Sequence, residues 1–185
     1  MFYTDSFEMK LAYHSAPSLL GIKPANLFSV TRKQAGQVEE FNMRASHRGF
    51  KIRVMCECNE RVLVILYNEK MLSTQLDDPV RKELLDSFGY AECKTLEAKL
   101  DMLSKAISSC DGFPHEIGLF LGYPVPDVTG FIENAGRDYI FSGYWKVYHE
   151  ENKARRTFGN YEKCRKFLVA KLSQGKDIYE ALKIA

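Results

Sequence analysis

The chain has 185 residues, of which 45% are hydrophobic and 27% are charged, and its formal net charge is +2. This composition is typical of a globular protein, and it argues against disordered, fibrous and strongly basic nucleic-acid-binding classes. The whole length is that of one average domain, so we expect residues 1–185 to form a single domain.

The sequence further predicts a soluble, cytoplasmic protein. Its first residues lack the basic start and apolar run of a signal peptide. The longest apolar run, from Val62 to Tyr67, is too short to cross a membrane. The odd number of cysteines, five, favours free thiols in a reducing compartment. We therefore expect no membrane contact and, from the near-balanced charge, no nucleic-acid partner.

The chain opens with an expected helix over residues 5–15. Phe7, Leu11 and His14 follow helical spacing, which puts His14 on the apolar stripe of that helix. Pro17 is expected to end the helix, because proline disfavours helical backbone at the residue before it.

The clearest strand runs from Phe50 to Cys58, where apolar and polar residues alternate. After a turn, residues 61–67 are apolar on both faces, which indicates a central strand paired with the first as a hairpin. Shorter strands are expected over residues 26–30 and 139–148. The strand over 139–148 contains Gly143, a typical position for a bulge.

Helices are expected between and after these strands. Asp78 and Thr95 are good N-caps, and each precedes an expected helix. The remaining helices are expected over residues 32–47, from Pro114 to about Leu121, from Pro126 to about Gly136, over 150–173 and after Lys176. Strands and helices do not alternate strictly, so the fold class is α+β: a small, mostly antiparallel sheet of about four strands covered by helices.

The common catalytic and cofactor motifs are absent. The chain has no phosphate loop, dinucleotide fingerprint, zinc-protease motif or serine-hydrolase elbow. Cys56 and Cys58 are spaced too closely for a structural zinc pair, and no second pair exists. Both lie on the apolar face of the expected strand, where free cysteine packs as a small hydrophobe. We therefore expect five reduced thiols and no bound metal.

The segment from Phe113 to Pro124 carries the strongest candidate site. Pro114 is expected to open a helix and to leave His115 and Glu116 in its first turn. The positive end of the helix dipole there stabilises a carboxylate and a neutral imidazole, which is a competent general base or metal ligand. The structural alternative is that Glu116 completes the cap and His115 hydrogen-bonds a nearby loop.

One face of the last expected strand is both polar and aromatic. Lys146 lies between Tyr144 and Tyr148 on that face, and Ser142 precedes them. Such a face can hold an anion or stack a flat ring, or it can be the wet face of an edge strand.

Two further candidates lie near the start of the chain. His14 is either an acid–base group or a satisfied core residue, and Lys23 either binds an anion or is solvated. The catalytic candidates are His115, Glu116 and His14, and the ligand-binding candidates are Lys23, Tyr123, Ser142, Tyr144, Lys146 and Tyr148. We expect His14, His115, Glu116 and Lys146 to surround one cavity, with Glu116 as the carboxylate beside Lys146.

Four segments resemble one protein family, the bacterial domain-of-unknown-function family 3793. They are His14 to Phe28, Pro114-His115-Glu116, Leu121-Gly122-Tyr123-Pro124, and Gly143 to Tyr148. The family has no established activity. Many members carry cysteine where this chain has Ser15 and Ser142, which implies that a shared thiolate metal site is weakened here. The family occurs largely in anaerobic Gram-positive organisms and is associated with iron-uptake and flavodoxin genes.

Two functions remain open. The first is a binding module for a small molecule or a protein partner in anaerobic iron or redox physiology. The second is an enzyme that uses His14, His115 and Glu116 as acid–base groups or metal ligands on a small anionic substrate, held by Lys23 or Lys146. A third interpretation gives these residues a purely structural role. None of the three interpretations implies a particular cofactor.

The absence of a linker and the apolar stripes from end to end lead to a first prediction. The chain should unfold as one cooperative unit. Differential scanning calorimetry should give a single transition, and two well-separated transitions would contradict the expectation.

Overall fold

The computed structural model describes residues 6–58, 60–109 and 113–184. The chain forms two compact units: unit 1 is the chain up to Leu72 together with Tyr161 onwards, and unit 2 is Ser73–Asn160. The long helix α8, Glu151–Ser173, begins in unit 2 and ends in unit 1. Cooperative unfolding of the whole chain stays a prediction, because two compact units can unfold together or separately.

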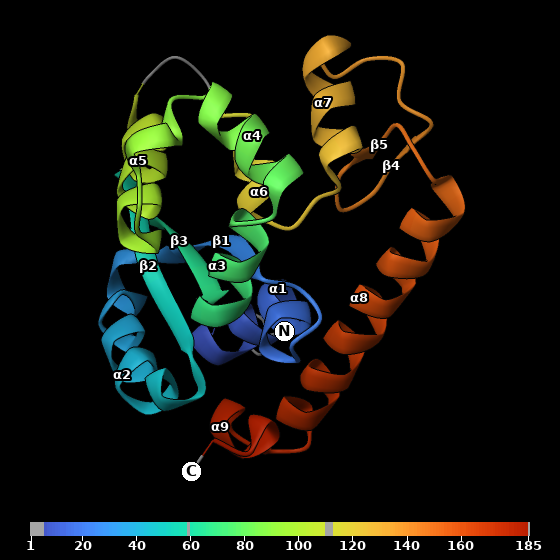
Figure 1. Cartoon of the computed structure of the whole chain (residues 1–185). Coiled ribbons are helices and arrows are strands. Elements are labelled where there is room, and N and C mark those ends of the chain that lie inside the picture. Colours follow the sequence, from blue (N-terminus) through green and yellow to red (C-terminus); the bar gives the residue numbers. More distant parts are fainter. Residues whose placement is uncertain (1–5, 59, 110–112, 185) are drawn as a thin grey trace. The chain divides into compact units, whose positions relative to one another are not determined.

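Unit 1 is built on a three-stranded antiparallel sheet in the order β1-β3-β2 (Figure 1). The strands are β1 Ala25–Thr31, β2 Phe50–Cys58 and β3 Arg61–Asn68. The central position predicted for the third of these strands is confirmed. The α+β class with a small antiparallel sheet is also confirmed, although this sheet has three strands, and a separate two-stranded sheet lies in unit 2.

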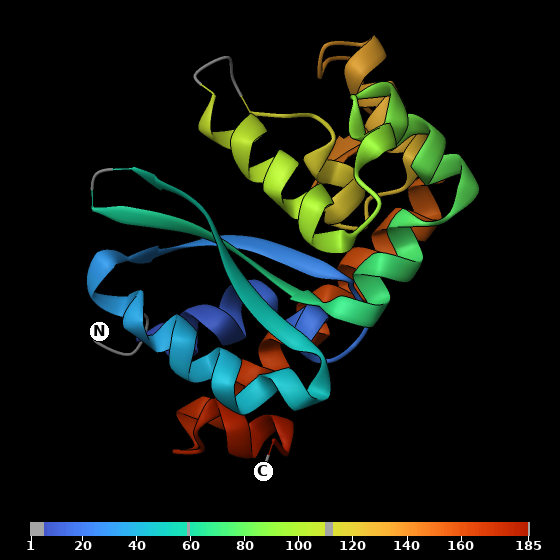
Figure 2. The ribbon, with the colours of Figure 1, turned by 60° about the vertical axis from the view of Figure 1, so that its left-hand side comes forward.

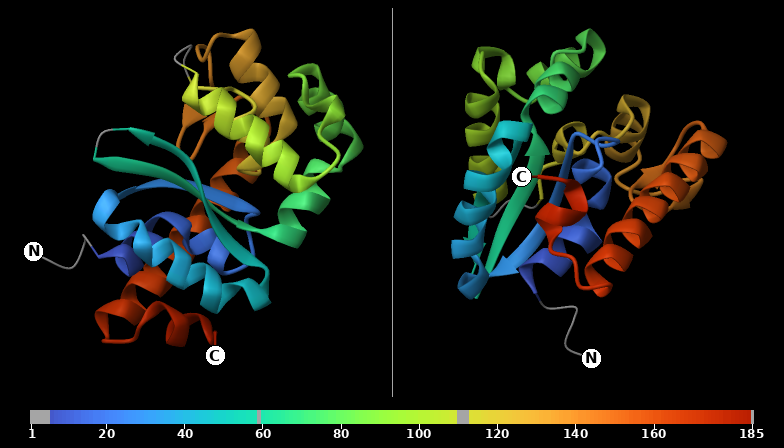
Figure 3. Two further views of the ribbon diagram at one scale, coloured as in Figure 1. Left: turned by 90° about the vertical axis from the view of Figure 1, so that its left-hand side faces the viewer. Right: turned by 90° about the horizontal axis from the view of Figure 1, so that it is seen from below.

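Two helices cover one face of this sheet, α1 Phe7–Leu19 and α2 Gly36–Ala45 (Figures 2 and 3). The short helix α9, Ile178–Leu182, and the C-terminal part of α8 complete the unit. The core lies between helices and sheet and includes Leu11, Phe41, Val30, Ile52, Val64, Leu66, Leu168 and Ile178. Short 3-10 turns lie at Arg32–Gln34, Ser46–Arg48 and Tyr90–Glu92.

Helix α1 differs from the expectation at two points. Pro17 lies inside the helix, which continues to Leu19. Proline is tolerated there because it removes only one amide donor near the end of the helix, and the backbone N–H of Ile22 still bonds the Pro17 carbonyl. His14 is exposed, not buried. Small residues such as Ala12 and Ala16 widen the buried face and turn it away from His14.

Strand β2 loses its alternation halfway. A β-bulge between Val54 and Cys56 shifts the register, so Met55 is 1% exposed and Val54 is 40% exposed. The apolar–polar alternation expected over Phe50 to Cys58 is therefore wrong at Val54, which it would place on the same face as Ile52. Cys56 is half-buried. The side chain of Cys58 and the residue Cys110 lie outside the described part of the chain.

The helices between residues 69 and 133 follow the expected order with one addition. The added helix begins in unit 1 and ends in unit 2, and the others lie in unit 2. The structure has α3 Glu69–Leu76, α4 Pro79–Ser87, α5 Leu96–Ser108, α6 Ile117–Phe120 and α7 Val125–Glu133. Asp78 and Thr95 are confirmed as N-caps, and each accepts a hydrogen bond from the third residue of its helix. The added helix, α3, begins where the side chain of Asn68 accepts a bond from the backbone of Met71.

The strand expected over residues 139–148 is a hairpin instead. Its two short strands, β4 Phe141–Ser142 and β5 Lys146–Val147, pair antiparallel around a turn at Gly143. A Cβ atom at Gly143 would lie 2.3 Å from the ring of Phe158, so only glycine lets the turn approach that ring. Residues 142–148 therefore do not form one polar strand face, because they lie on both sides of a turn.

Lys23, which follows α1, is buried with only 3% of its surface exposed. Burial lowers the pKa of its ammonium group to about 7, because the charged form loses its hydration. Its Nζ lies 5.8 Å from the centre of the Tyr161 ring. Of the two alternatives for Lys23, the solvated loop lysine is therefore wrong.

This burial predicts a pH-dependent stability. Between pH values of about 7 and 10.5 the unfolded chain keeps a proton on Lys23 that the folded chain releases. The free energy of unfolding should therefore rise with pH in this window, by up to about 1.4 kcal/mol per pH unit. Urea unfolding of Lys23→Met at several pH values should lack this rise.

Lys33→Met is the matched control, because Lys33 is an exposed lysine of the same unit. Its pH dependence should equal that of the wild type. A wild-type rise that persists in Lys23→Met would show that another group is responsible.

Candidate functional site

Unit 2 contains a pocket with a volume of about 500 Å³. It lies between the turn before α6, helices α6 and α7, and the β4–β5 hairpin. Its size is in the range of sites that bind small organic molecules. The lining residues are Phe113, Pro114, His115, Ile117, Gly118, Tyr123, Asp127, Val128, Phe131, Ser142, Trp145 and Lys146.

Asp127, one of the lining residues, joins α7 to the hairpin. It is 3% exposed. One carboxylate oxygen, Oδ2, accepts the indole N–H of Trp145 at 2.7 Å. The other, Oδ1, accepts the backbone N–H groups of Tyr148 and His149 at 2.8 and 2.9 Å. The buried charge is thus satisfied by three donors, which hold the hairpin in register with the first turn of α7.

Two glycines let the elements around the pocket approach closely. A Cβ atom at Gly130 would lie 2.6 Å from the Tyr148 ring, so α7 lies directly against the residue that follows β5. A Cβ atom at Gly118 would lie 2.9 Å from Val128, so α6 and α7 are equally close. Larger residues at either position would force these walls apart.

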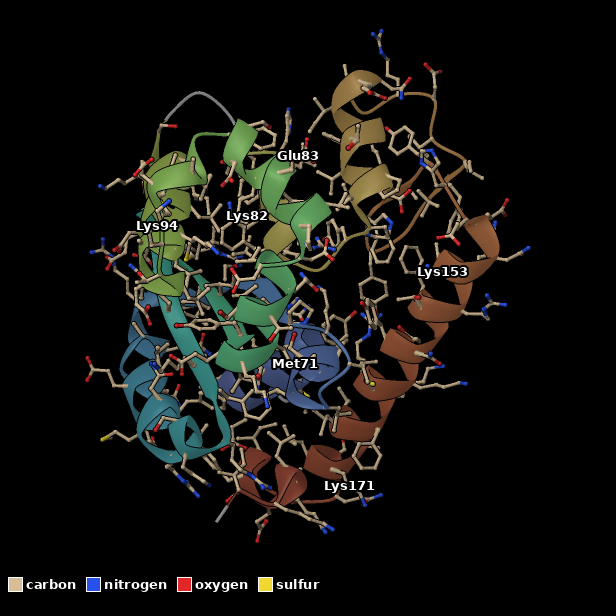
Figure 4. The ribbon with its side chains drawn as sticks, in the orientation of Figure 1. Met71, Lys82, Glu83, Lys94, Lys153 and Lys171 are labelled. Carbon is tan, nitrogen blue, oxygen red and sulfur yellow. The ribbon has the colours of Figure 1, made fainter. Side chains whose placement is uncertain are left out.

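The loop between α6 and α7, which carries Tyr123, is held by a side chain from α4. The guanidinium of Arg81 donates from one nitrogen, Nη1, to the carbonyls of Leu119 and Tyr123, at 3.2 and 3.0 Å. Burial lowers the pKa of Arg81, although nearby Asp78 opposes this effect. Helix α4, which carries Lys82 and Glu83 in Figure 4, thus anchors the loop.

Aromatic rings form part of the pocket wall and pack against one another. The Trp145 ring lies 5.0 Å from Tyr123 and 4.5 Å, edge-on, from Phe158. Burial raises the pKa of Tyr123 to about 12, so its hydroxyl stays protonated at neutral pH. The rings of His115 and Phe131 make an edge-to-face pair, with ring centres 5.3 Å apart. Aromatic pairs of this kind add about 1 kcal/mol each and stiffen the walls.

Lys146 supplies the cationic group of the pocket. Its Nζ donates to the carbonyl of Gly136 at 2.7 Å. The same nitrogen lies 4.9 Å from the centre of the Tyr139 ring and 5.6 Å from that of Phe131. The ammonium is therefore held among aromatic rings at one side of the pocket.

Four of the candidates from the sequence lie together in this pocket: His115, Tyr123, Ser142 and Lys146. Ser142 and Lys146 are paired across the hairpin. Tyr144 packs on Phe158 instead, and Tyr148 packs on Gly130. His14 and Lys23 belong to unit 1.

Glu116 does not have the surroundings expected for it. It is buried, and its Oε1 accepts the hydroxyl proton of Tyr90 at 3.2 Å. Burial, and then the charge of Glu116, raise the pKa of Tyr90. Within the described residues Lys146 bonds a backbone carbonyl and not Glu116. The helix-dipole argument also fails, because α6 has only four residues and His115 and Glu116 precede it.

His14 lies on the exposed side of α1. Its ring is parallel to Phe28 at 6.1 Å and edge-on to Tyr13 at 5.1 Å. Partial burial lowers its pKa, and the charges of Arg165 and Lys10 act in the same direction. The neutral imidazole is therefore favoured, as expected for a base, but within unit 1 and not in the unit 2 pocket.

The described part of the chain has no group of three or more His, Cys, Asp or Glu side chains arranged to hold a metal ion. Among its helices, none is both long enough and apolar enough to cross a bilayer. The thiol of Cys93 lies 3.7 Å from the sulfur of Met102, and Cys164 packs against the unit 1 core, where burial raises its pKa.

Sequence reasoning missed two residues of the pocket, Asp127 and Trp145, whose hydrogen bond joins α7 to the hairpin. Asp127 falls at the start of the helix expected from Pro126, and Trp145 falls within the strand expected over 139–148, and neither position by itself indicates a site. The two belong to separate predicted elements, and their hydrogen bond joins residues 18 positions apart. A usable signal was the acidic residue directly after Pro126, together with the only tryptophan of the chain. Both residue types need a polar partner when buried.

These features define an α+β protein with a small-molecule-sized, aromatic-walled pocket. The chain belongs to the family described as protein of unknown function (DUF3793), whose model matches residues 11–182. The family resemblance of the sequence is therefore confirmed. No curated protein and no solved structure matches the chain.

The three hydrogen bonds of Asp127 predict that Asp127→Asn is destabilising. An amide keeps one acceptor oxygen and replaces the other by a donor, so at least one buried N–H loses its partner. We expect the free energy of unfolding to fall by about 1–3 kcal/mol, measured by urea unfolding.

Glu133→Gln is the control, because it removes a carboxylate from an exposed position of the same helix. It should change stability by less than about 0.5 kcal/mol. Wild-type stability and unchanged Trp145 emission in Asp127→Asn would contradict the structural role assigned to this carboxylate.

Proposed function

We propose that this protein is a binding module for a small organic molecule, which the unit 2 pocket holds. The observation that carries the proposal is the pocket itself, with largely apolar, aromatic walls and a few convergent polar groups. Such a lining is typical of ligand sites, in which apolar contact supplies affinity and a few polar groups fix orientation.

Binding is better supported than catalysis. General acid–base chemistry needs an imidazole or carboxylate within hydrogen-bond reach of the reacting atoms. His115 faces the pocket, but Glu116 bonds Tyr90, and the oxygens of Asp127 already accept three donors. The enzyme alternative would therefore rest on His115 as the acid–base group, with Lys146 holding the substrate.

The cellular setting is part of the same proposal. The near-balanced charge, +2 over 185 residues, favours a small molecule over a nucleic acid as the partner. The odd cysteine count favours a cytoplasmic location. A role in the iron or redox physiology of anaerobic bacteria is suggested by the family resemblance alone, and a protein partner for the same surface is the alternative within it.

The chain offers a direct test, because its single tryptophan lines the pocket. A molecule that enters the pocket should change Trp145 emission. We expect a screen of small aromatic and heterocyclic molecules to give saturable emission changes with micromolar dissociation constants, on the order of 8 kcal/mol of binding free energy.

A pocket-filling variant separates binding in the pocket from binding elsewhere. Ser142→Phe adds a ring at an exposed lining position and should weaken each hit by about tenfold or more. Asn152→Phe adds the same ring on exposed α8 and should leave affinity unchanged. A screen without hits, or hits that bind Ser142→Phe as tightly as the wild type, would refute the proposal.

A further inference from the structure

We infer that the ligand of this pocket is a flat aromatic molecule with one anionic group, and that Lys146 recognises the anion. This inference rests on the proposed function and names the chemical class of its ligand. It combines three observations: the aromatic walls, the charge that faces the pocket, and the position of the Lys146 ammonium.

The walls favour a flat, unsaturated ligand over a sugar or an amino acid. Four aromatic rings line the pocket together with His115: those of Phe113, Tyr123, Phe131 and Trp145. Few of the lining atoms are polar. The tight contacts at Gly118 and Gly130 hold α7 in place, and the hydrogen bond to Asp127 orients Trp145, so the Phe131 and Trp145 rings are set before a ligand arrives. Stacking on such rings is worth about 1 kcal/mol per contact.

The charge that faces the pocket is positive. Two charged side chains line it, Lys146 and Asp127. The side chain of Asp127 is only 2% exposed, and its two oxygens accept from Trp145, Tyr148 and His149. Its charge is thus directed into the protein fold. A cationic ligand would have to compete with three existing donors for this carboxylate.

Lys146 has the capacity to bind an anion. An ammonium group carries three N–H donors. Within the described residues the carbonyl of Gly136 takes one of them, which fixes the position of Nζ and leaves two for a ligand. The nitrogen lies 5.6 Å from the centre of the Phe131 ring, itself a pocket wall. A ligand stacked on this wall would place a carboxylate or phosphate within reach of Nζ.

The test compares two probes with the same rings and different charge. Anilinonaphthalene sulfonate is an aromatic anion, and phenylnaphthylamine is its uncharged parent. Energy transfer from Trp145 to either probe reports binding near the only tryptophan. We expect the anion to bind wild-type protein about tenfold more tightly than the parent, with an affinity that falls as salt is added.

Variants at Lys146 identify the group responsible. Lys146→Met should weaken the anionic probe by about tenfold and leave the neutral probe within about twofold. Lys146→Arg should retain the preference for the anion. The control is Lys153→Met, which removes the same charge from the first turn of α8, where the side chain is 65% exposed (Figure 4). It should leave both probes unchanged.

Competition then distinguishes the two kinds of natural anion. Naphthoate and naphthyl phosphate should both displace the sulfonate probe from wild-type protein, and the tighter competitor identifies the carboxylate or the phosphate as the preferred group. Neither should do so from Lys146→Met at the same concentration. Displacement by neither compound from the wild type would overturn the inference.

The two proposals fail in different ways. If both probes bind near Trp145 equally well, and Lys146→Met weakens both or neither, the ligand class is wrong while the binding pocket stands. If neither probe binds, the inferred ligand class is wrong, and the binding module is refuted as well only when the screen of small molecules also gives no hits. Urea unfolding of each variant shows whether a loss of affinity comes from a loss of fold.

Discussion

The hydrogen bonds of Asp127 are the interaction on which the pocket depends. A buried carboxylate is stable only when its charge is satisfied, and here an indole N–H and two backbone N–H groups satisfy it. The same bonds set the orientation of Trp145 and the register of the hairpin relative to α7. The position of Lys146, next to Trp145 on this hairpin, follows from that register. One carboxylate therefore orients an aromatic wall and places the cationic group beside it.

Three glycines are equally important for this arrangement, because they lack a Cβ atom where neighbouring elements come close. Gly118 and Gly130 let α6, α7 and the segment after β5 come within van der Waals contact, and Gly143 lets the hairpin turn against Phe158. Packed elements of this kind resist small displacements, because interiors are as dense as organic crystals. Arg81 adds a restraint from α4 on the loop that carries Tyr123. These contacts hold α6, α7, the hairpin and the loop of Tyr123 together around the pocket.

Sequence reasoning succeeded where the signal is local. Periodicity and capping identified β3 as a central strand and placed the starts of α4 and α5, since both depend on residues a few positions apart. Four pocket residues, among them His115 and Lys146, were also selected by local context. The failures involved longer-range effects: the bulge at Met55, the hairpin at Gly143 and the exposure of His14. Each of these depends on what the segment packs against.

The sequence by itself determined the α+β class, most of the helices and strands, and the family, because hydrophobic period, caps and motifs are carried by neighbouring residues. The tertiary structure alone decided which candidates share a pocket. His115, Tyr123, Ser142 and Lys146 line one pocket. Glu116 instead accepts a hydrogen bond from Tyr90, and Lys23 is buried within unit 1. The physical reason is that the hydrogen-bond partner of a buried polar group is determined by the residues that pack around it. Packing joins residues that are far apart in the chain, and no spacing in the sequence records those contacts.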